Sequence, residues 1–486
     1  MSRDDRPDIL DWLGLRQRPV WAAARWLGPL LSVTVIALFL LAVATAFVML
    51  GGAIFGSTLD SPRATLGTGA VTVALIGAPF VVWRAIVAQK QADVAEQGHI
   101  TERINTAVQG LGAEKEVKRD GVESTEPNLE VRIGAIYALE RIARDSDRDH
   151  VQIMEILCAY IRQNAPAPQA DDWPELEMRE GEDDGPLAAD WNERLQAFRE
   201  AQAKAKAGLK PREDIQVALT VIGRRTAKQR RLEAGRGEEV EFPFDREPPE
   251  YDGPEDGHDK TTLATHRARV RAWKEALIDY TGYRLDLRNA DLRGADLSGL
   301  NLNGARLDGT FLQGADLWQA RLQGAELMAA RLQGADLREI RLQWAQLAEA
   351  RLQGAHLWGA RLQGADLEDA RLQEAKLLHV SLQGAYLGWA RLQGADLGSA
   401  RFGPDTDLSW ANLSGAAARS VDFTGMPEIA DQLAGMFGDG SVKLPDGCDR
   451  PAHWPRQELD FGEFLKQWRE WQADPNGYTP PERTAG

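Results

Sequence analysis

The sequence GADLWQARLQGAELMAARLQGADLREI, residues 314–340, repeats a five-residue pattern in which a leucine follows a small residue by two positions. The pattern runs from Leu287 to Phe402 without a slip, and 19 of its 24 small positions hold Ala. A period of five fits neither the turn of an α-helix nor the two-residue alternation of a strand. It fits a chain that turns a corner every five residues and points its leucines inward, so the sequence predicts a solenoid.

The repeated segments are similar to a known family. GADLWQARLQGAEL and RNADLRGADL resemble the A(D/N)Lxx unit of pentapeptide-repeat proteins. The resemblance implies a right-handed quadrilateral β-helix with about 20 residues per coil. One coil buries too little surface to be stable alone, because a buried leucine contributes only about 1.5–3 kcal/mol before entropy is subtracted. We therefore expect the coils to stack into one column, with a helix near residues 262–280 covering its open end.

We expect a multi-domain chain that is anchored at its N-terminus and folded mainly after residue 84. The expected segments are a cytoplasmic interfacial leader (1–28), a transmembrane hairpin of two α-helices (29–83), a small α-helical region with an acidic loop (84–234), a disordered acidic linker (235–261), the cap helix with the β-helix (262–425), and a short α-helical C-terminal cap (426–486).

Two apolar runs predict the hairpin. Leu30 to Phe55 is uncharged and long enough to cross about 30 Å of hydrocarbon, and Thr65 to Trp83 is near the minimum length. A signal peptide is the competing interpretation of the first run, but its apolar core would be only about 7–15 residues long. Arginines flank the pair on its outer sides, which predicts that both termini are cytoplasmic and that the protein lies in a bacterial inner membrane.

The segment LEVRIGAIYALERIARDSDRDHVQIMEILCAYIR, residues 129–162, predicts two antiparallel helices, since apolar residues recur at helical spacing on both sides of a polar break. Its spacing is similar to a HEAT-type hairpin. It also resembles a helical segment that accompanies pentapeptide repeats in a group of bacterial membrane-anchored proteins. One such hairpin cannot bury its own apolar face, so it must dock elsewhere in the molecule.

A basic run, RRTAKQRR, follows at residues 224–231. Its charged members are Arg224, Arg225, Lys228, Arg230 and Arg231. A solvated helix end is one interpretation, because positive charge suits the C-terminal end of a helix dipole. Attraction to anionic lipid is the other, because we expect this region to be held close to a membrane.

The sequence carries no pattern for catalysis, cofactor binding or metal binding. Its 7 His and 2 Cys are scattered, and no HExxH, Cys-x-x-Cys, phosphate loop or nucleophile elbow occurs. We therefore predict a protein that is not an enzyme and has no cofactor or metal. A net charge of −16 argues against nucleic-acid binding, since proteins that bind nucleic acids neutralise phosphates with Lys and Arg.

One side of the predicted column carries large side chains that have no core to enter. Exposed aromatic residues beside arginine are typical of binding hot spots. We predict a partner-binding surface there, formed by Trp318, Arg338, His356, Trp358, Lys376 and Leu378. The alternative is that the C-terminal tail or the 129–162 hairpin covers these residues within the same chain.

We therefore predict a non-catalytic, membrane-tethered scaffold that presents a β-helix in the cytoplasm to an unknown protein partner, and a homo-oligomer is compatible with the sequence. The alternative follows from the resemblance, because some pentapeptide-repeat proteins are acidic rods that mimic DNA and bind gyrase. Between Arg284 and Gly425 the chain has 15 basic and 17 acidic residues. This near balance disfavours a DNA-mimic regulator of a DNA-bound enzyme such as gyrase.

Overall fold

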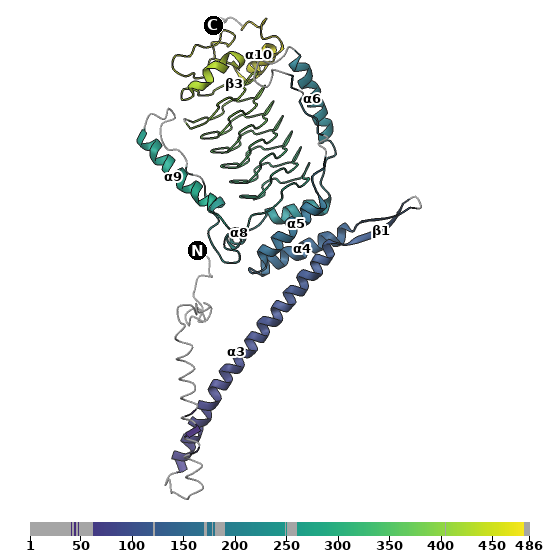
Figure 1. Cartoon of the computed structure of the whole chain (residues 1–486), viewed down its shortest axis with the longest axis vertical. Helices are drawn as coiled ribbons and strands as arrows, with labels where there is room; N and C mark the ends of the chain where they lie inside the picture. The colour runs from purple at the N-terminus through teal and green to yellow at the C-terminus, as the bar shows by residue number, and fades with distance from the viewer. Residues whose placement is uncertain are drawn as a thin grey trace. The chain divides into compact units, whose positions relative to one another are not determined.

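The computed structural model describes residues 40, 43–44, 47, 62–119, 122–169, 173–176, 178–179, 190–247, 249, 260–403 and 405–480. The chain forms two compact units, Met1–Glu102 and Arg103–Gly486. Helix α3 (Pro62–Leu111) begins in the first unit and ends in the second. An antiparallel pair follows, β1 (Glu114–Arg119) with β2 (Val122–Pro127). The rest of the second unit is a helical region and a column of stacked coils (Figure 1).

The transmembrane hairpin predicted over residues 29–83 is corrected by the structure. In the part of the chain that the structure describes, no helix is both long enough and apolar enough to cross a membrane. The second predicted span, Thr65 to Trp83, is one portion of the 50-residue α3, which continues without a break through Arg84 and Lys90. The first, Leu30 to Phe55, lies outside the described residues except at four positions. The inner-membrane location rested on that hairpin and stays a prediction.

The solenoid register predicted from the leucines is confirmed. Parallel backbone bridges join residues 20 positions apart, from Asp286 with Arg306 to Ser381 with Arg401. The second residue after each inward leucine has a positive φ, as at Gly294 (65°), so the backbone turns every five residues. Four turns therefore fall within each coil, and the column has four sides and four corners.

The inside of the column is apolar and closely packed. Leu347 and Ala345, two residues before it, are both 0% exposed, and nearly all inward positions of the repeat are buried in the same way, with Leu300 and Phe402 only partly buried. Each coil is hydrogen-bonded to the next, since the Leu347 N–H donates to the Asp366 carbonyl at 2.6 Å. The outermost coils have such a neighbour on one side only, and an exposed edge there would invite pairing with another chain.

The helical region consists of four helices that pack against one another below the first coil in Figure 1. They are α4 (Leu129–Asp145), α5 (His150–Asn164), α7 (Glu213–Gly223) and α8 (Ala227–Ala234). The predicted pair of helices over 129–162 corresponds to α4 and α5. Their apolar faces meet in a core that includes Ile136, Leu139 and Leu157, all 0% exposed.

This region closes the N-terminal end of the column. The first coil has no preceding coil to accept its backbone N–H groups, and the helical region accepts three of them instead. Asp291 donates to the Ala165 carbonyl at 2.7 Å, and Asn301 donates to the Gly223 carbonyl at 2.9 Å. The N–H of Asp296 donates to Gln216 Oε1 at 3.0 Å. The surface on which the 129–162 hairpin docks is therefore the edge of the first coil.

Two further helices lie along corners of the column (Figure 1). Along one corner, α6 (Trp191–Lys206) reaches the column through Arg199, Gln202 and Lys206. Along another corner lies α9 (Lys260–Ile278), whose Trp273 ring packs on Trp344 with centroids 5.5 Å apart. We expected this second helix to cover the open end. It lies along a corner instead, because that end is already occupied by α5 and α7.

A short 3-10 helix, η1 (Pro243–Asp245), packs beside α9. It falls within the segment expected to be a disordered linker, yet Phe242 and Phe244 are only 3% and 2% exposed. Phe244 lies over the turn glycines Gly304 and Gly324, where a Cβ would come within 3 Å of its ring. Two aromatic side chains thus order the first part of a segment whose acidic composition predicted disorder.

The C-terminal tail closes the other end of the column. Bridged residues become 21 positions apart at Tyr386 and Asp407, as the extra residue before Leu408 predicted. The strand β3 (Ala417–Ala418) then pairs in parallel with β4 (Phe437–Gly438), and the connection contains η2 (Pro427–Gly435). Helix α10 (Phe461–Ala473) buries Phe464, Trp468 and Trp471 against Phe437.

Candidate protein-interaction surface

The structure brings the six predicted partner-binding residues together on adjacent coils. Trp318, Arg338, Trp358 and Leu378 each follow an inward leucine and stack at one corner, which we call the Trp318 edge. His356 and Lys376 are bridged to each other on the side that leads into this corner. Trp318 is 43% exposed and Trp358 is 41% exposed, so both rings present apolar surface to solvent.

The charges along this edge are arranged in pairs and are close to balance. Arg338 forms an ion pair with Asp336 at 2.6 Å. Partial burial would raise the pKa of the Asp336 carboxyl, but the hydrogen bonds from Arg338 outweigh it and hold the pKa below its usual value. Burial and the neighbouring Lys376 lower the pKa of His356, so its imidazole is neutral near pH 7. A partner would therefore meet aromatic surface between small, compensated charges.

A pocket of about 330 Å³ lies at the C-terminal end of the edge. Its lining combines column residues with α10, including Trp358, Leu378, Asp396, Arg419 and Phe461. Burial raises the pKa of the Asp396 carboxyl, which accepts a hydrogen bond from the Gly398 N–H at 3.1 Å. The repeat pattern could not predict that α10 residues line this pocket, because α10 lies outside the repeats and reaches the pocket only when the tail closes the column.

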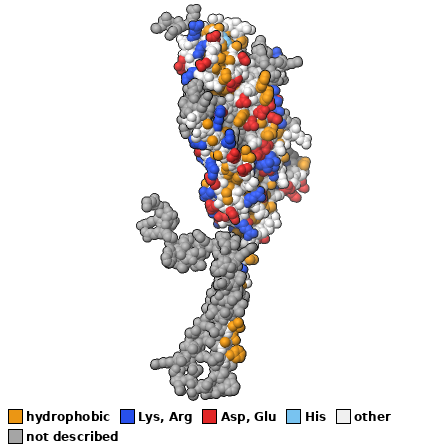
Figure 2. Space-filling view, turned by 60° about the vertical axis from the view of Figure 1, so that its left-hand side comes forward, with side chains coloured by type: hydrophobic (Ala, Val, Ile, Leu, Met, Phe, Trp, Pro, Cys, Tyr) orange, Lys and Arg blue, Asp and Glu red, His pale blue; other side chains and the backbone are white. Residues whose placement is uncertain are grey.

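The structure also shows what the chain itself covers. At the C-terminal end of the edge, Phe461 and Phe464 of α10 line the pocket. The 129–162 hairpin lies against the first coil instead, and its neighbour α7 is the helix that contacts Asp296. The C-terminal tail therefore covers one end of the edge, and the rings of Trp318 and Trp358 stay partly exposed. Figure 2 shows hydrophobic side chains interspersed with charged ones on the column surface.

The basic residues at 224–231 form ion pairs within the chain. Arg224 pairs with Glu140 at 2.5 Å, and Lys228 pairs with Asp147 at 2.6 Å. Arg230 pairs with Asp245 at 2.8 Å, and Arg231 pairs with Glu239 at 3.3 Å. These four and Arg225 were predicted to be candidates for facing lipid. The run offers no unpaired positive cluster, because each basic group already has a carboxylate partner.

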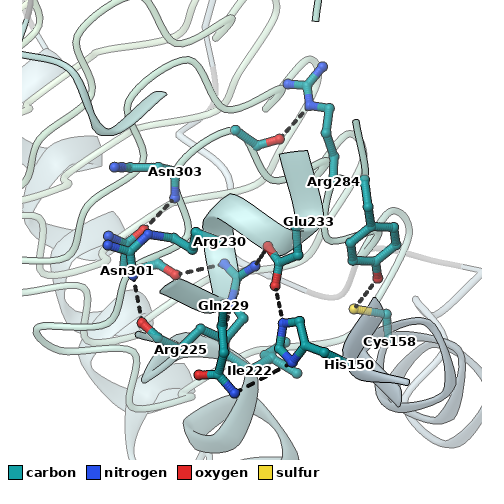
Figure 3. A network of polar contacts seen from close by, with 12 residues as sticks. His150, Cys158, Ile222, Arg225, Gln229, Arg230, Glu233, Arg284, Asn301 and Asn303 are labelled. Atoms are coloured by element: carbon teal, nitrogen blue, oxygen red, sulfur yellow. Dashed lines mark hydrogen bonds and ion pairs between the residues drawn. The ribbon is translucent and has the colours of Figure 1, made fainter. Parts of the chain in front are cut away.

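Arg225 lies at the centre of a buried network beneath the column (Figure 3). It is 5% exposed and pairs with Glu233, whose other oxygen is 2.8 Å from His150 Nε2. The second arm of its guanidinium donates to the Asn301 carbonyl at 3.2 Å, on the first coil. Burial would raise the pKa of Glu233, but the charge of Arg225 outweighs it and lowers that pKa. The network therefore ties α8 and α5 to the column, and lipid binding by the basic run stays a prediction.

No metal or nucleophilic site emerges from the geometry of the described residues. Within the described ranges, no group of three or more His, Cys, Asp or Glu side chains is placed to hold a metal ion. Both cysteines are free, and Cys158 is buried beside Tyr283, whose hydroxyl lies 3.6 Å from the sulfur. Burial raises the pKa of the Cys158 thiol to about 11, which keeps it protonated and unreactive.

The family model for pentapeptide repeats matches the column, with eight copies over residues 284–314, 312–343 and 340–377. This column is a pentapeptide-repeat solenoid. The match covers residues 284–377 of the column and leaves its last repeats, the helical region and the tail outside it.

Several solved structures are similar to the pentapeptide-repeat column. HetL, a pentapeptide-repeat protein involved in heterocyst differentiation regulation in the cyanobacterium Nostoc, is 29% identical over 33% of this chain and 76% of its own, with a TM-score of 0.21. QnrB1, a plasmid-mediated fluoroquinolone resistance protein, is 18% identical over 38% of this chain and 89% of its own, with a TM-score of 0.22. A pentapeptide-repeat protein of the Arabidopsis thaliana thylakoid lumen is 25% identical over 30% and 78%, with a TM-score of 0.10. The search of curated proteins gave no match.

Proposed function

We propose that this chain is a non-catalytic interaction scaffold whose pentapeptide-repeat column presents the Trp318 edge to a partner protein. The observation that carries the proposal is the exposure of Trp318 and Trp358, at 43% and 41%, because both rings lie outside a column interior that leucine and alanine side chains fill. The two residues are separated by two coils, or about 10 Å at β-strand spacing. A rigid column holds them at this distance without any cost for ordering, which favours binding.

The edge fits a protein surface better than a small molecule. Its aromatic groups are spread along the column, its charges are compensated, and the pocket at its C-terminal end, at about 330 Å³, is near the lower limit of about 300 Å³ for ligand sites. No enzyme family matched the chain, and the family model that did match is that of pentapeptide repeats. These observations support interaction with another protein as the function.

The test uses the full chain carrying Trp318→Ala together with Trp358→Ala, and Tyr137→Ala as the control, because Tyr137 is an aromatic residue that is 48% exposed on α4, away from the column edges. Partners are identified by proximity labelling from the column and then measured with purified components. We expect the double variant to lose binding with an unchanged melting temperature, while the control keeps both. A melting temperature lowered by several degrees would assign the edge to packing within the chain. An unchanged set of bound proteins would remove it as a partner site.

No observation favours the alternative function, a DNA-mimic regulator of a DNA-bound enzyme such as gyrase. A DNA mimic needs a strongly acidic rod, whereas the column and its first tail residues carry 15 basic and 17 acidic residues between 284 and 425. The likeness to QnrB1 at 18% identity concerns the fold alone. We therefore propose the scaffold function and leave regulation of a DNA-bound enzyme as the competing outcome of partner identification.

A further inference from the structure

Two helices of this chain, α6 and α9, already pack along corners of the column. Along one corner of the column, α6 contacts three successive coils through residues three and four positions apart. Arg199 pairs with Glu374 at 2.6 Å, Gln202 donates to the Gln353 carbonyl at 3.2 Å, and Lys206 donates to the Gly334 carbonyl at 3.3 Å. Three to four helical residues rise about 4.5–6 Å, which matches the spacing of about 4.8 Å between coils. A helix laid along a corner therefore meets each coil once per turn.

A second corner shows the same mode of contact. Helix α9 packs its Trp273 ring on Trp344, and its Arg267 pairs with Asp405. Trp344 occupies the turn position with a φ of 60°, in the left-handed region that costs a non-glycine residue free energy. The column therefore offers α6 a carboxylate and backbone carbonyls at one corner, and it offers α9 an aromatic ring and a carboxylate at the other.

A third corner combines exposed tryptophans with carboxylates, and we call it the Trp389 edge. Trp389 and Trp410 occupy the turn position on adjacent coils with φ of 53° and 62°, and the Trp389 N–H donates to the Ser409 carbonyl at 3.0 Å. Trp389 is 52% exposed and Trp410 is 77% exposed, and Met328 at the same corner is 47% exposed. In contrast to Trp344, neither of these two tryptophans is covered by a described segment.

Carboxylates accompany these rings on the same face. Glu349, Glu368 and Asp369 lie at this corner on the two coils that precede Trp389, and all three are exposed. None of the three forms an ion pair with another described residue. On the adjoining side, Arg331 lies over the Phe311 ring at 4.0 Å and Arg351 pairs with Glu175, so these two arginines have other partners. The apolar groups of this edge are therefore flanked by negative charge.

We propose that the Trp389 edge docks a basic helix of a partner protein, laid along the column as α6 and α9 are. The apolar face of that helix covers Trp389, Trp410 and Met328. Arginine or lysine residues three to four positions apart then reach the carboxylates of successive coils. This surface is separate from the Trp318 edge, which lies at the opposite corner, so the proposal goes beyond the function inferred above.

The probe is a fluorescent synthetic peptide of residues 260–278, a basic helix that carries Trp273, and the control peptide replaces Arg267, Arg269 and Arg271 by Glu. Binding to the full chain is measured by fluorescence anisotropy at low and high salt. We expect the basic peptide to bind, the control peptide not to bind, and the affinity to fall as salt rises. We expect Trp389→Gly with Trp410→Gly to weaken binding by about tenfold or more, and Glu368→Lys with Asp369→Lys to act similarly. Trp318→Ala with Trp358→Ala is the matched control and should keep wild-type affinity.

The same glycine variants separate binding from packing. Glycine relieves the left-handed turn at both positions, so we expect the melting temperature to stay equal or rise while binding falls. A lowered melting temperature, equal affinity of wild type and the glycine variant, or no binding of the basic peptide to wild type would each overturn the proposal. Self-association of the wild type that Trp410→Gly abolishes would also overturn it, because a second copy would then be the occupant. Loss of binding only in the Trp318/Trp358 variant would instead assign the basic helix to the Trp318 edge.

Discussion

Glu374 should make the docking of α6 depend on pH. It stands at a turn position that is glycine in most coils, with a φ of 61°, and its side chain is 5% exposed. One carboxylate oxygen accepts a hydrogen bond from Arg199 at 2.6 Å, and the other lies over Gly394. Burial raises the pKa of Glu374 to about 7 despite Arg199, whose side chain is 57% exposed and well solvated.

The sign of the effect follows from linkage between protonation and folding. The carboxyl binds its proton more tightly in the folded chain than at its model value of 4.5, so its contribution to stability is fully present below about pH 4.5. That contribution is lost as the pH rises through about 7. A rise of about 2.5 pKa units corresponds to about 3 kcal/mol. Above pH 7 this is the cost of holding the charged form beneath α6.

Glu374→Gln keeps the shape and removes the titration. We expect wild type and variant to be equally stable near pH 4.5, and the variant to be more stable by up to about 3 kcal/mol at pH 8. Urea unfolding across this pH range measures the difference, and hydrogen exchange of the α6 amides locates it. Glu349→Gln is the matched control, because Glu349 is an exposed turn residue with a φ of 59°, and it should give parallel curves. A Glu374→Gln variant that is less stable than wild type at pH 8 would refute the reasoning, since Arg199 would then outweigh burial.

Three further changes test the column itself. Leu347→Arg places an unpaired charge where the leucine is 0% exposed, so we expect the free energy of unfolding to fall by several kcal/mol. Circular dichroism should then show no cooperative thermal transition. The same change at the exposed neighbour Gln346 should leave the transition intact. Gln216→Ala removes the side-chain partner of the Asp296 N–H and carbonyl on the first coil. Both groups are exposed and water can replace the lost bonds, so we expect a cost of only about 0.5–1.5 kcal/mol in urea unfolding. Gly394 has a φ of 67°, and Gly394→Ala adds a methyl that meets Glu374 Oε1. We expect the variant to lose at least about 1 kcal/mol of stability from the left-handed turn alone, and therefore to melt at a lower temperature than wild type.

The column could be predicted from the sequence because its register is a local property. Period-five leucines with Ala two residues earlier predict a corner every five residues, the resemblance to pentapeptide repeats implies 20 residues per coil, and the structure repeats that spacing from Asp286 to Arg401. The bulge before Leu408 followed from counting residues. The stacking of Trp318 and Trp358 at one corner also followed, since residues 20 or 40 apart must align once the coil length is known.

The segments that lie against the column could not be predicted in the same way. The basic run looked available to lipid, yet Arg224 pairs with Glu140, 84 positions away in sequence. Composition predicted disorder around Phe244, which docks on Gly304 because the turn glycines leave space for a ring. The helix predicted to cover the open end lies along a corner, since α5 and α7 supply the acceptors that the first coil needs. Such contacts join segments with no shared period, so their free energy depends on which surfaces the folded column leaves open, and this is a property that no local pattern in the sequence records.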